Sequence, residues 1–214
     1  MDINFISDVF FKYAASEYWN KWYSENKEYF KDLVGKHKKK RRKELQEIIQ
    51  ERKSVPCKRC GGEFHFSAMD LVHRDPKSKN FSLRDATRLI HSKEKLIEEI
   101  DKCDVVCANC VKEEKIKQFL KETDGNGSRN RRRKKLRELI NQIKTKPCKD
   151  CGQAFAPYVM ELDHLDGDKK VDSVSKMINK ERPIKLIMEE LDKTESICTN
   201  CHRIRTYNRS HGDE

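Results

Sequence analysis

Hydrophobic residues recur at helical spacing in the first part of the chain. Ile6 and Phe10 lie four residues apart, and Trp19 and Trp22 lie three residues apart. This pattern predicts a helical N-terminal segment over residues 1–35, which also holds more than half of the aromatic residues. The segment either packs as a helical pair on the unit that follows or serves as a dimerisation or partner-docking element.

Two further amphipathic patterns each begin with a run of positive charge. Lys38–Lys43 is an unbroken run of six cations, and Arg131–Lys135 is a second run. Apolar residues follow each run at helical spacing: Leu45, Ile48 and Ile49 in one case, and Leu136, Leu139 and Ile140 in the other. We therefore predict two basic helices that bury one face and expose cations, either to solvent or to the phosphates of a nucleic acid.

The chain repeats one pattern of chemistry-bearing residues at a fixed spacing. Each member of the second set lies 91 residues after its counterpart: Cys57, Cys60, His73, Cys107 and Cys110 recur as Cys148, Cys151, His164, Cys198 and Cys201. A long fixed period marks a duplicated structural unit. We therefore predict two tandem units, 36–121 and 129–214, joined by a linker at 122–128 that is rich in Gly, Asn and Asp.

The paired Cys-x-x-Cys motifs are typical of structural zinc sites. Four thiolates per unit match the tetrahedral coordination of a closed zinc site. The predicted ligand sets are Cys57, Cys60, Cys107 and Cys110 for one Zn²⁺, and Cys148, Cys151, Cys198 and Cys201 for the other. The ninth cysteine, Cys103, corresponds to Thr194 in the repeat and is not expected to be a ligand.

A long excursion separates the two motifs of each set. In the first unit 46 residues lie between Cys60 and Cys107, too many for a compact zinc ribbon, so the excursion must hold structure of its own. We expect a short β-segment leading to the histidine, then a turn and a helix. The turns and helices are Asp75–Pro76 with 92–102 in the first unit and Asp166–Gly167 with 183–193 in the second. A terminal helix follows, clearest at 111–121.

The composition explains why units of this kind need a metal ion. It also narrows the class of binding partner and the cellular compartment. Only 36% of the residues are hydrophobic and 39% are charged, so each unit has a thin core. The net charge of +11 favours a polyanionic partner, most simply nucleic acid. No stretch resembles a signal peptide or a membrane span, so we expect the reducing cytoplasm and no membrane partner.

Three polar residues in the second unit form a candidate catalytic group. Asp163 and His164 are adjacent, so on a strand they point to opposite faces. His202 directly follows the zinc ligand Cys201, so the structural ion fixes its position. An oxygen from Asp163 and a nitrogen from His202 suit a partly open site for a hard divalent cation, and His164 suits general-base activation of water.

These residues resemble the HNH nuclease superfamily, also called ββα-metal nucleases, and especially its zinc-bound endonuclease VII-like branch. The resemblance covers about residues 146–209 and rests on Cys148-x-x-Cys151-Gly152, Leu162-Asp163-His164-x-Asp166-Gly167 and Ile197-Cys198-Thr199-Asn200-Cys201-His202-Arg203. It implies an α+β fold: two tandem zinc-stabilised ββα-metal-type units after a helical N-terminal segment. By this resemblance His164 is the general base, and Asp163 and His202 hold a catalytic Mg²⁺ or Mn²⁺.

The chain departs from the family pattern in two respects. The family usually has a middle Asn before the second motif, whereas Asp192–Ser196 contains none, so the residue that orients His164 is not identified. In the first unit Val72 and Val111 replace Asp163 and His202, and valine cannot coordinate a cation. The first unit is therefore expected to be inactive, with its histidine hydrogen-bonded in the core.

The function expected from the sequence is hydrolysis of DNA phosphodiester bonds by an HNH-type endonuclease of restriction or nicking type. The single active site would lie in the second unit, and double-strand cleavage would need a homodimer. The alternative is a catalytically inactive, zinc-stabilised protein with a nucleic-acid-binding or architectural role.

Overall fold

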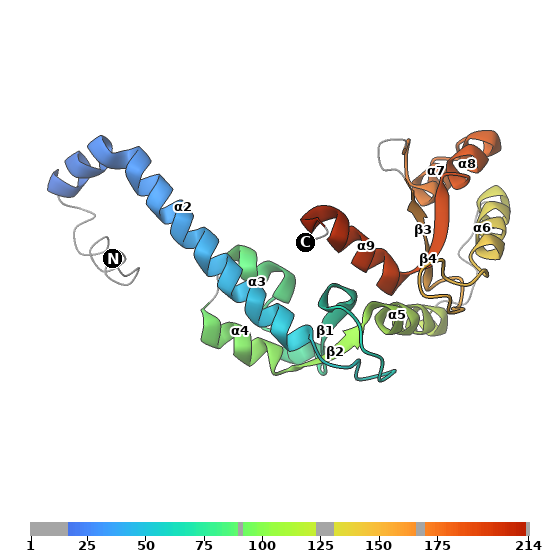
Figure 1. Cartoon of the computed structure of the whole chain (residues 1–214), viewed down its shortest axis with the longest axis horizontal. Coiled ribbons are helices and arrows are strands. Elements are labelled where there is room, and N and C mark those ends of the chain that lie inside the picture. Colours follow the sequence, from blue (N-terminus) through green and yellow to red (C-terminus); the bar gives the residue numbers. More distant parts are fainter. Residues whose placement is uncertain (1–16, 90–91, 123–130, 166–169, 213–214) are drawn as a thin grey trace. The chain divides into compact units, whose positions relative to one another are not determined.

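The computed structural model describes residues 17–89, 92–122, 131–165 and 170–212 (Figure 1). Its helices are α2 Glu17–Lys53, α3 Leu83–Leu89, α4 Lys93–Ile100, α5 Ala108–Glu122, α6 Arg131–Ile143, α7 Val174–Asn179, α8 Ile184–Leu191 and α9 Thr199–His211. Its strands are β1 Met69–His73, β2 Cys103–Cys107, β3 Met160–His164 and β4 Thr194–Cys198. Short 3₁₀ turns cover Phe66–Ala68 and Pro76–Ser78. The predicted α+β class is confirmed.

Parts of several predictions lie outside the described residues. These are the first sixteen residues of the N-terminal segment, nearly all of the predicted linker and the predicted turn at Asp166–Gly167. The two repeats are called the first copy, which carries the cysteines from Cys57 to Cys110, and the second copy, which carries those from Cys148 to Cys201. The equivalent turn of the first copy is described. There Asp75 Oδ1 accepts a hydrogen bond of 2.9 Å from the Lys77 N–H and caps the short turn that Pro76 begins. An Asp side chain before Pro favours such a turn because it bonds the backbone two residues on.

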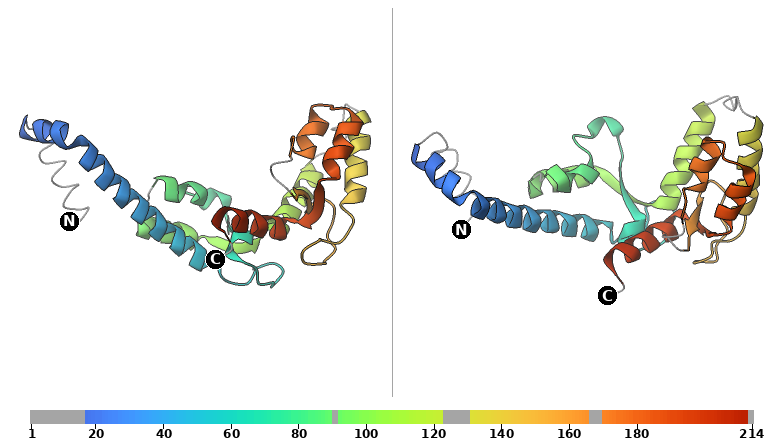
Figure 2. Two further views of the ribbon diagram at one scale, coloured as in Figure 1. Left: turned by 45° about the horizontal axis from the view of Figure 1, so that its top comes forward. Right: turned by 90° about the horizontal axis from the view of Figure 1, so that it is seen from above.

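Helix α2 joins two elements that the sequence separates. The predicted aromatic segment, from Glu17 onward, and the first basic run lie in one helix of 37 residues. The helix is kinked at Asn26, where φ is −115° and ψ is 19°, and the Asn26 side chain donates to Trp22 O at 2.9 Å. Figure 2 shows this bend near one end of α2. Gly35 does not end the helix, because a single interior glycine costs only about 1 kcal/mol.

Each copy has the order strand, helices, strand, helix. Strands β3 and β4 pair antiparallel, with Met160 opposite Cys198 and His164 opposite Thr194. Helices α7 and α8 lie between these strands in sequence, and α9 follows β4 without a loop. Strands β1 and β2 form the equivalent sheet, with α3 and α4 between them and α5 directly after. The two copies therefore share a ββα core into which a helical pair is inserted.

The hydrophobic cores are small, as the composition predicts. In the second copy α6 packs against α7 and α8 (Figure 1). The buried residues of this core are Leu136, Ile140, Val174, Met177, Ile178, Ile187 and Leu191. A separate cluster beneath the second cysteine set contains Cys148, Met160, Ile197 and Cys198, and its counterpart in the first copy contains Cys57, Met69, Val106 and Cys107. Cysteines are thus part of the core in both copies.

Backbone contacts divide the chain into two compact units. One comprises the chain up to Arg52 with His73–Cys103, and the other comprises Lys53–Val72 with the chain from Asp104 onward. Both cysteine sets and the ββα core of the second copy fall in the latter unit. The division at residues 35, 121 and 128 stays a prediction. Among the described residues, no helix is long and apolar enough to cross a membrane.

Helix α8 offers a matched test of the core. Ile187 is 1% exposed and Ile184, on the same helix, is 53% exposed. Ile187→Ala is expected to lower the free energy of unfolding by about 2–4 kcal/mol, because it removes buried methyl groups and leaves a cavity. Ile184→Ala is expected to change it by less than about 0.5 kcal/mol. Urea denaturation with excess zinc measures both, and equal effects would contradict this packing.

Candidate functional site

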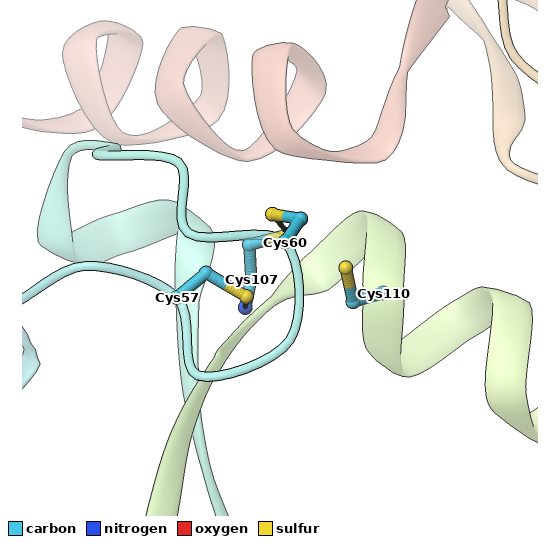
Figure 3. Close-up of side chains that lie close together, drawn as sticks. All are labelled: Cys57, Cys60, Cys107 and Cys110. Atoms are coloured by element: carbon cyan, nitrogen blue, oxygen red, sulfur yellow. Dashed lines mark hydrogen bonds between the residues drawn. The ribbon is translucent and has the colours of Figure 1, made fainter.

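Four cysteine thiols converge in each copy. The Sγ atoms of Cys57, Cys60, Cys107 and Cys110 lie within 4.8 Å of one another, as do those of Cys148, Cys151, Cys198 and Cys201. Figure 3 shows the first set: two residues come from a loop, Cys107 ends β2 and Cys110 lies on α5. A tetrahedral site with Zn–S bonds of about 2.3 Å has sulfur atoms about 3.8 Å apart. The Cys60 and Cys107 sulfurs are 3.9 Å apart, so this donor set fits zinc.

The loop that carries each first pair is shaped by backbone hydrogen bonds. Gly61 has φ of +70° and donates to Cys57 O at 2.9 Å, and Gly152 repeats both the angle and the bond to Cys148 O. Glycine adopts this left-handed conformation without the steric cost that a side chain brings. The glycine after each Cys-x-x-Cys motif therefore closes the turn that directs the two thiols to one point.

The sulfur of the first cysteine in each set accepts hydrogen bonds from backbone N–H groups. Burial alone would raise the pKa of Cys57, but N–H donors from Cys107, Cys60 and Arg59 outweigh it, and the pKa lies at about 6. The same balance brings the pKa of Cys148 to about 7. The Cys107 and Cys198 N–H groups donate to Cys57 Sγ and Cys148 Sγ respectively, each at 3.2 Å. These donors favour the thiolate form of the first cysteine in each set, which is the form that binds a cation.

Cys103 is buried outside both sets. Its thiol donates to Glu99 O at 3.4 Å at the start of β2. Among the described residues, Cys103 is not one of the thiols that converge within 4.8 Å, and its exclusion as a ligand stays a prediction.

Metal content tests the two sets directly. The purified chain is expected to hold two equivalents of zinc, and Cys57→Ser or Cys148→Ser to lose one equivalent each, because a closed tetrahedral site loses affinity when a soft ligand is removed. Cys103→Ser is the matched control and is expected to retain both. Elemental analysis after exhaustive dialysis measures the ratio, and loss of zinc from the Cys103 variant would contradict the assignment.

His164 is held by a buried carboxylate. It is 7% exposed, and its Nε2 lies 2.8 Å from Glu190 Oε1. Glu190, on α8, also accepts from Lys193 Nζ at 2.9 Å and from the Val171 N–H at 3.0 Å. Burial alone would raise the pKa of Glu190, but the bonds from Lys193, Val171 and His164 outweigh it and bring the pKa to about 2. Glu190 is therefore ionised at neutral pH and acts as the acceptor for Nε2–H.

The first copy repeats this arrangement. His73 Nε2 lies 2.8 Å from Glu99 Oε1, and Glu99 accepts from Lys102 Nζ at 2.8 Å and from the Asn80 N–H at 2.8 Å. His73 is thus hydrogen-bonded to a buried carboxylate, as the sequence predicts, and its side chain is 12% exposed. Because both copies have this histidine–glutamate bond, the bond helps to hold the fold. It can have a further role in the second copy.

The structure brings Asp163 and His202 together. Asp163, at 4% exposure, points from β3 toward α9, and its Oδ1 lies 3.5 Å from His202 Nε2. Asp163 also accepts hydrogen bonds from Arg205 at 3.2 Å and from Arg209 at 2.7 and 3.0 Å. Burial alone would raise the pKa of Asp163, but the bonds from Arg209 and Arg205 outweigh it and keep the pKa below its usual value. The carboxylate is therefore available as an anion.

Glu161 completes this cluster. It lies two residues before Asp163 on the same face of β3, where it contacts His202 Nδ1 and Lys112 Nζ. Burial alone would raise the pKa of Glu161, but the bonds from His202 and Lys112 outweigh it and bring the pKa to about 2. The His202 ring thus lies between two ionised carboxylates.

A cavity of about 520 Å³ opens beside His202. Helix α5 contributes Lys112 and Lys115 to its walls, and α9 contributes Arg203 and Tyr207. Cations and the Glu161 carboxylate therefore line the cavity beside His202.

The first copy lacks the residues equivalent to Asp163 and His202 and to the two arginines, although Asp70 keeps a carboxylate at the position of Glu161. Val72 and Val111, which replace Asp163 and His202, pack on the apolar cluster beneath the first cysteine set. Glu114 and Gln118 stand 91 residues before Arg205 and Arg209. The residues aimed at Asp163 thus differ between the copies as a group, whereas the cysteines do not.

Sequence reasoning missed four residues of this region: Glu161, Glu190, Arg205 and Arg209. The repeat contained a signal for three of them, because Glu190 recurs as Glu99 and both arginines change together with Asp163. Comparison of the chain with protein-family models, with curated proteins and with solved structures finds no match.

Proposed function

We propose that the chain is a metal-dependent endonuclease that hydrolyses phosphodiester bonds in DNA, with one active site in the second copy. The observation that carries this proposal is the approach of Asp163 Oδ1 and His202 Nε2 to 3.5 Å. His202 lies on α9, which begins directly after Cys198, and Asp163 lies on β3, which pairs with the strand that Cys198 ends. Their separation is therefore set by the frame rather than by a loop.

The donor set fits a hard divalent cation. Asp163 supplies oxygen and His202 supplies nitrogen, and an Mg²⁺ or Mn²⁺ shell with two protein ligands has room for water and a phosphate oxygen. A cation bound there would act as a Lewis acid that stabilises charge on the phosphate and on the leaving 3′ oxygen. Arg205 and Arg209, now bonded to Asp163, are placed to transfer hydrogen bonds to the phosphate.

His164 is the proposed general base, and Glu190 sets its tautomer. Because ionised Glu190 accepts the Nε2 proton, the neutral imidazole carries its lone pair on Nδ1. Nδ1 is then the atom that takes a proton from the attacking water. Glu190 thereby fills the orienting role for which the sequence supplies no Asn.

Charge on other elements supports a DNA partner. Most of the side chains of the first basic run, including Lys38, Lys39 and Lys43, are exposed along α2. A run of exposed cations on one helix is suited to a phosphate backbone, whose binding it strengthens without reading sequence.

A second candidate function is a zinc-stabilised nucleic-acid-binding protein without activity. One observation favours it: the bond between histidine and buried carboxylate is the same in the copy that lacks Asp163 and His202. On that view His164 serves only the fold.

Substitution of the candidate ligands separates the two functions. Asp163→Asn and His202→Ala are expected to abolish DNA cleavage in Mg²⁺ or Mn²⁺ while retaining DNA binding and both zinc ions. Val111→Ala, at the position equivalent to His202, is expected to cleave at the wild-type rate because no cation ligand is lost. Plasmid relaxation and gel-shift assays measure these effects, and tight binding without cleavage by the wild type would favour the second function.

The duplicated histidine–glutamate bond supplies a control for the role of Glu190. Glu190→Gln removes the charge that fixes the His164 tautomer, so kcat is expected to fall by about 10²-fold or more with little change in KM. Glu99→Gln breaks the equivalent bond in the first copy and is expected to leave kcat unchanged. Both variants are expected to lose about 1–3 kcal/mol of stability, because each disturbs a buried acceptor. Equal kcat values for the two would remove Glu190 from the mechanism.

A further inference from the structure

The two copies meet through a pair of asparagines at equivalent positions. The Asn109 N–H donates to Asn200 Oδ1 at 2.9 Å, and the Asn200 N–H donates to Asn109 Oδ1 at 2.9 Å. Both residues are buried in the first turns of α5 and α9, and these helices pack together. Each copy therefore offers the same donor and acceptor to the other.

Ion pairs repeat this reciprocity. Arg203 Nη1 on α9 lies 2.7 Å from Asp70 Oδ1 on β1, and Lys112 Nζ on α5 contacts Glu161 Oε1 on β3. Lys112 and Arg203 are repeat equivalents, as are Asp70 and Glu161. The basic residue of each terminal helix thus binds the acid on the first strand of the other copy.

Two lysines at equivalent positions feel the charges of these ion pairs. The charges of Asp70 and Arg203 act on Lys53, and those of Glu161 and Lys112 act on Lys144, its repeat equivalent. Burial lowers the pKa of both lysines. The asparagine pair and the ion pairs therefore obey one rule, in which position i of one copy contacts position j of the other and j contacts i.

Contacts of this reciprocal kind are those of a two-fold homodimer interface. Here they join two parts of one chain. We propose that the protein is a single-chain pseudo-dimer that nicks one strand of duplex DNA, with the first copy in the place of a second subunit. The nicking step rests on the proposed function, whereas the docking of the two copies does not.

The asymmetry of the pair determines the product. In the second copy water forms a P–O bond and gives a proton to His164 Nδ1, while the bond from phosphorus to the leaving 3′ oxygen breaks and that oxygen takes a proton from solvent. In the first copy Val72 and Val111 fill the equivalent position with apolar packing. A pseudo-dimer therefore presents two frames to the duplex and hydrolyses one strand.

Mass and product together test the proposal. The chain is expected to run as a 25.4 kDa monomer in light scattering at micromolar concentration and to convert supercoiled plasmid to open circles in Mg²⁺ or Mn²⁺, at a rate first-order in protein. A dimer that linearises plasmid directly would overturn it. If no DNA is cut, the proposed function fails, and the docking is decided by the mass and by the charge swap below.

A charge swap tests the docking without activity. Asp70→Arg and Arg203→Asp are each expected to lower the melting temperature by a few degrees, because each places like charges together. The double variant is expected to recover most of the loss. Losses that simply add would show that the two positions do not meet in solution, and this would overturn the pseudo-dimer.

Giving the first copy the candidate catalytic residues tests whether the pseudo-dimer presents it to the other DNA strand. Val72→Asp with Val111→His, together with Glu114→Arg and Gln118→Arg, gives the first copy the residues that the second copy carries. This monomeric variant is expected to produce linear plasmid, because the pseudo-symmetry presents the second frame to the other strand. A folded, DNA-binding variant that still only nicks would contradict that placement.

Discussion

The convergence of four thiols on one point, once in each copy, is the constraint on which the rest of the structure depends. The apolar clusters beneath the thiols contain few residues, so packing alone holds little of each copy together. The cysteines also stand at the junctions of the fold. Cys198 ends β4 and Cys201 lies in the first turn of α9, so a metal ion at this set fixes the direction of α9 and with it the position of His202.

The four-cysteine frame occurs in both copies, whereas the candidate catalytic residues occur in the second copy. Electrostatics explains why Asp163 and the residues around it differ from their counterparts as a group. A buried carboxylate at Asp163 is tolerable only with cations around it, and Arg205 and Arg209 supply them. When the carboxylate is replaced by Val72, the cations have no partner. The equivalent positions then hold Val111, Glu114 and Gln118.

The histidine–glutamate bond illustrates how a structural feature can also serve chemistry. In both copies a buried, ionised glutamate ties the insert between the strands to the histidine that ends the first strand. This contact holds the long excursion against the sheet. In the second copy the same contact fixes which imidazole nitrogen of His164 carries the proton.

The sequence by itself determined the elements with a local or periodic cause. The 91-residue repeat gave both cysteine sets and the duplicated order of elements, and helix signals placed α4 and α8 within one or two residues of the predicted ranges 92–102 and 183–193. The predicted boundary at residue 35 does not interrupt the helix, because Gly35 at that junction is too weak a breaker to end it. Only the tertiary structure decided the contacts between distant residues: Glu190 with His164, Arg209 with Asp163, and Asn109 with Asn200. These depend on how the helical insert and the two terminal helices pack, and side-chain pattern along the chain does not encode the register of that packing.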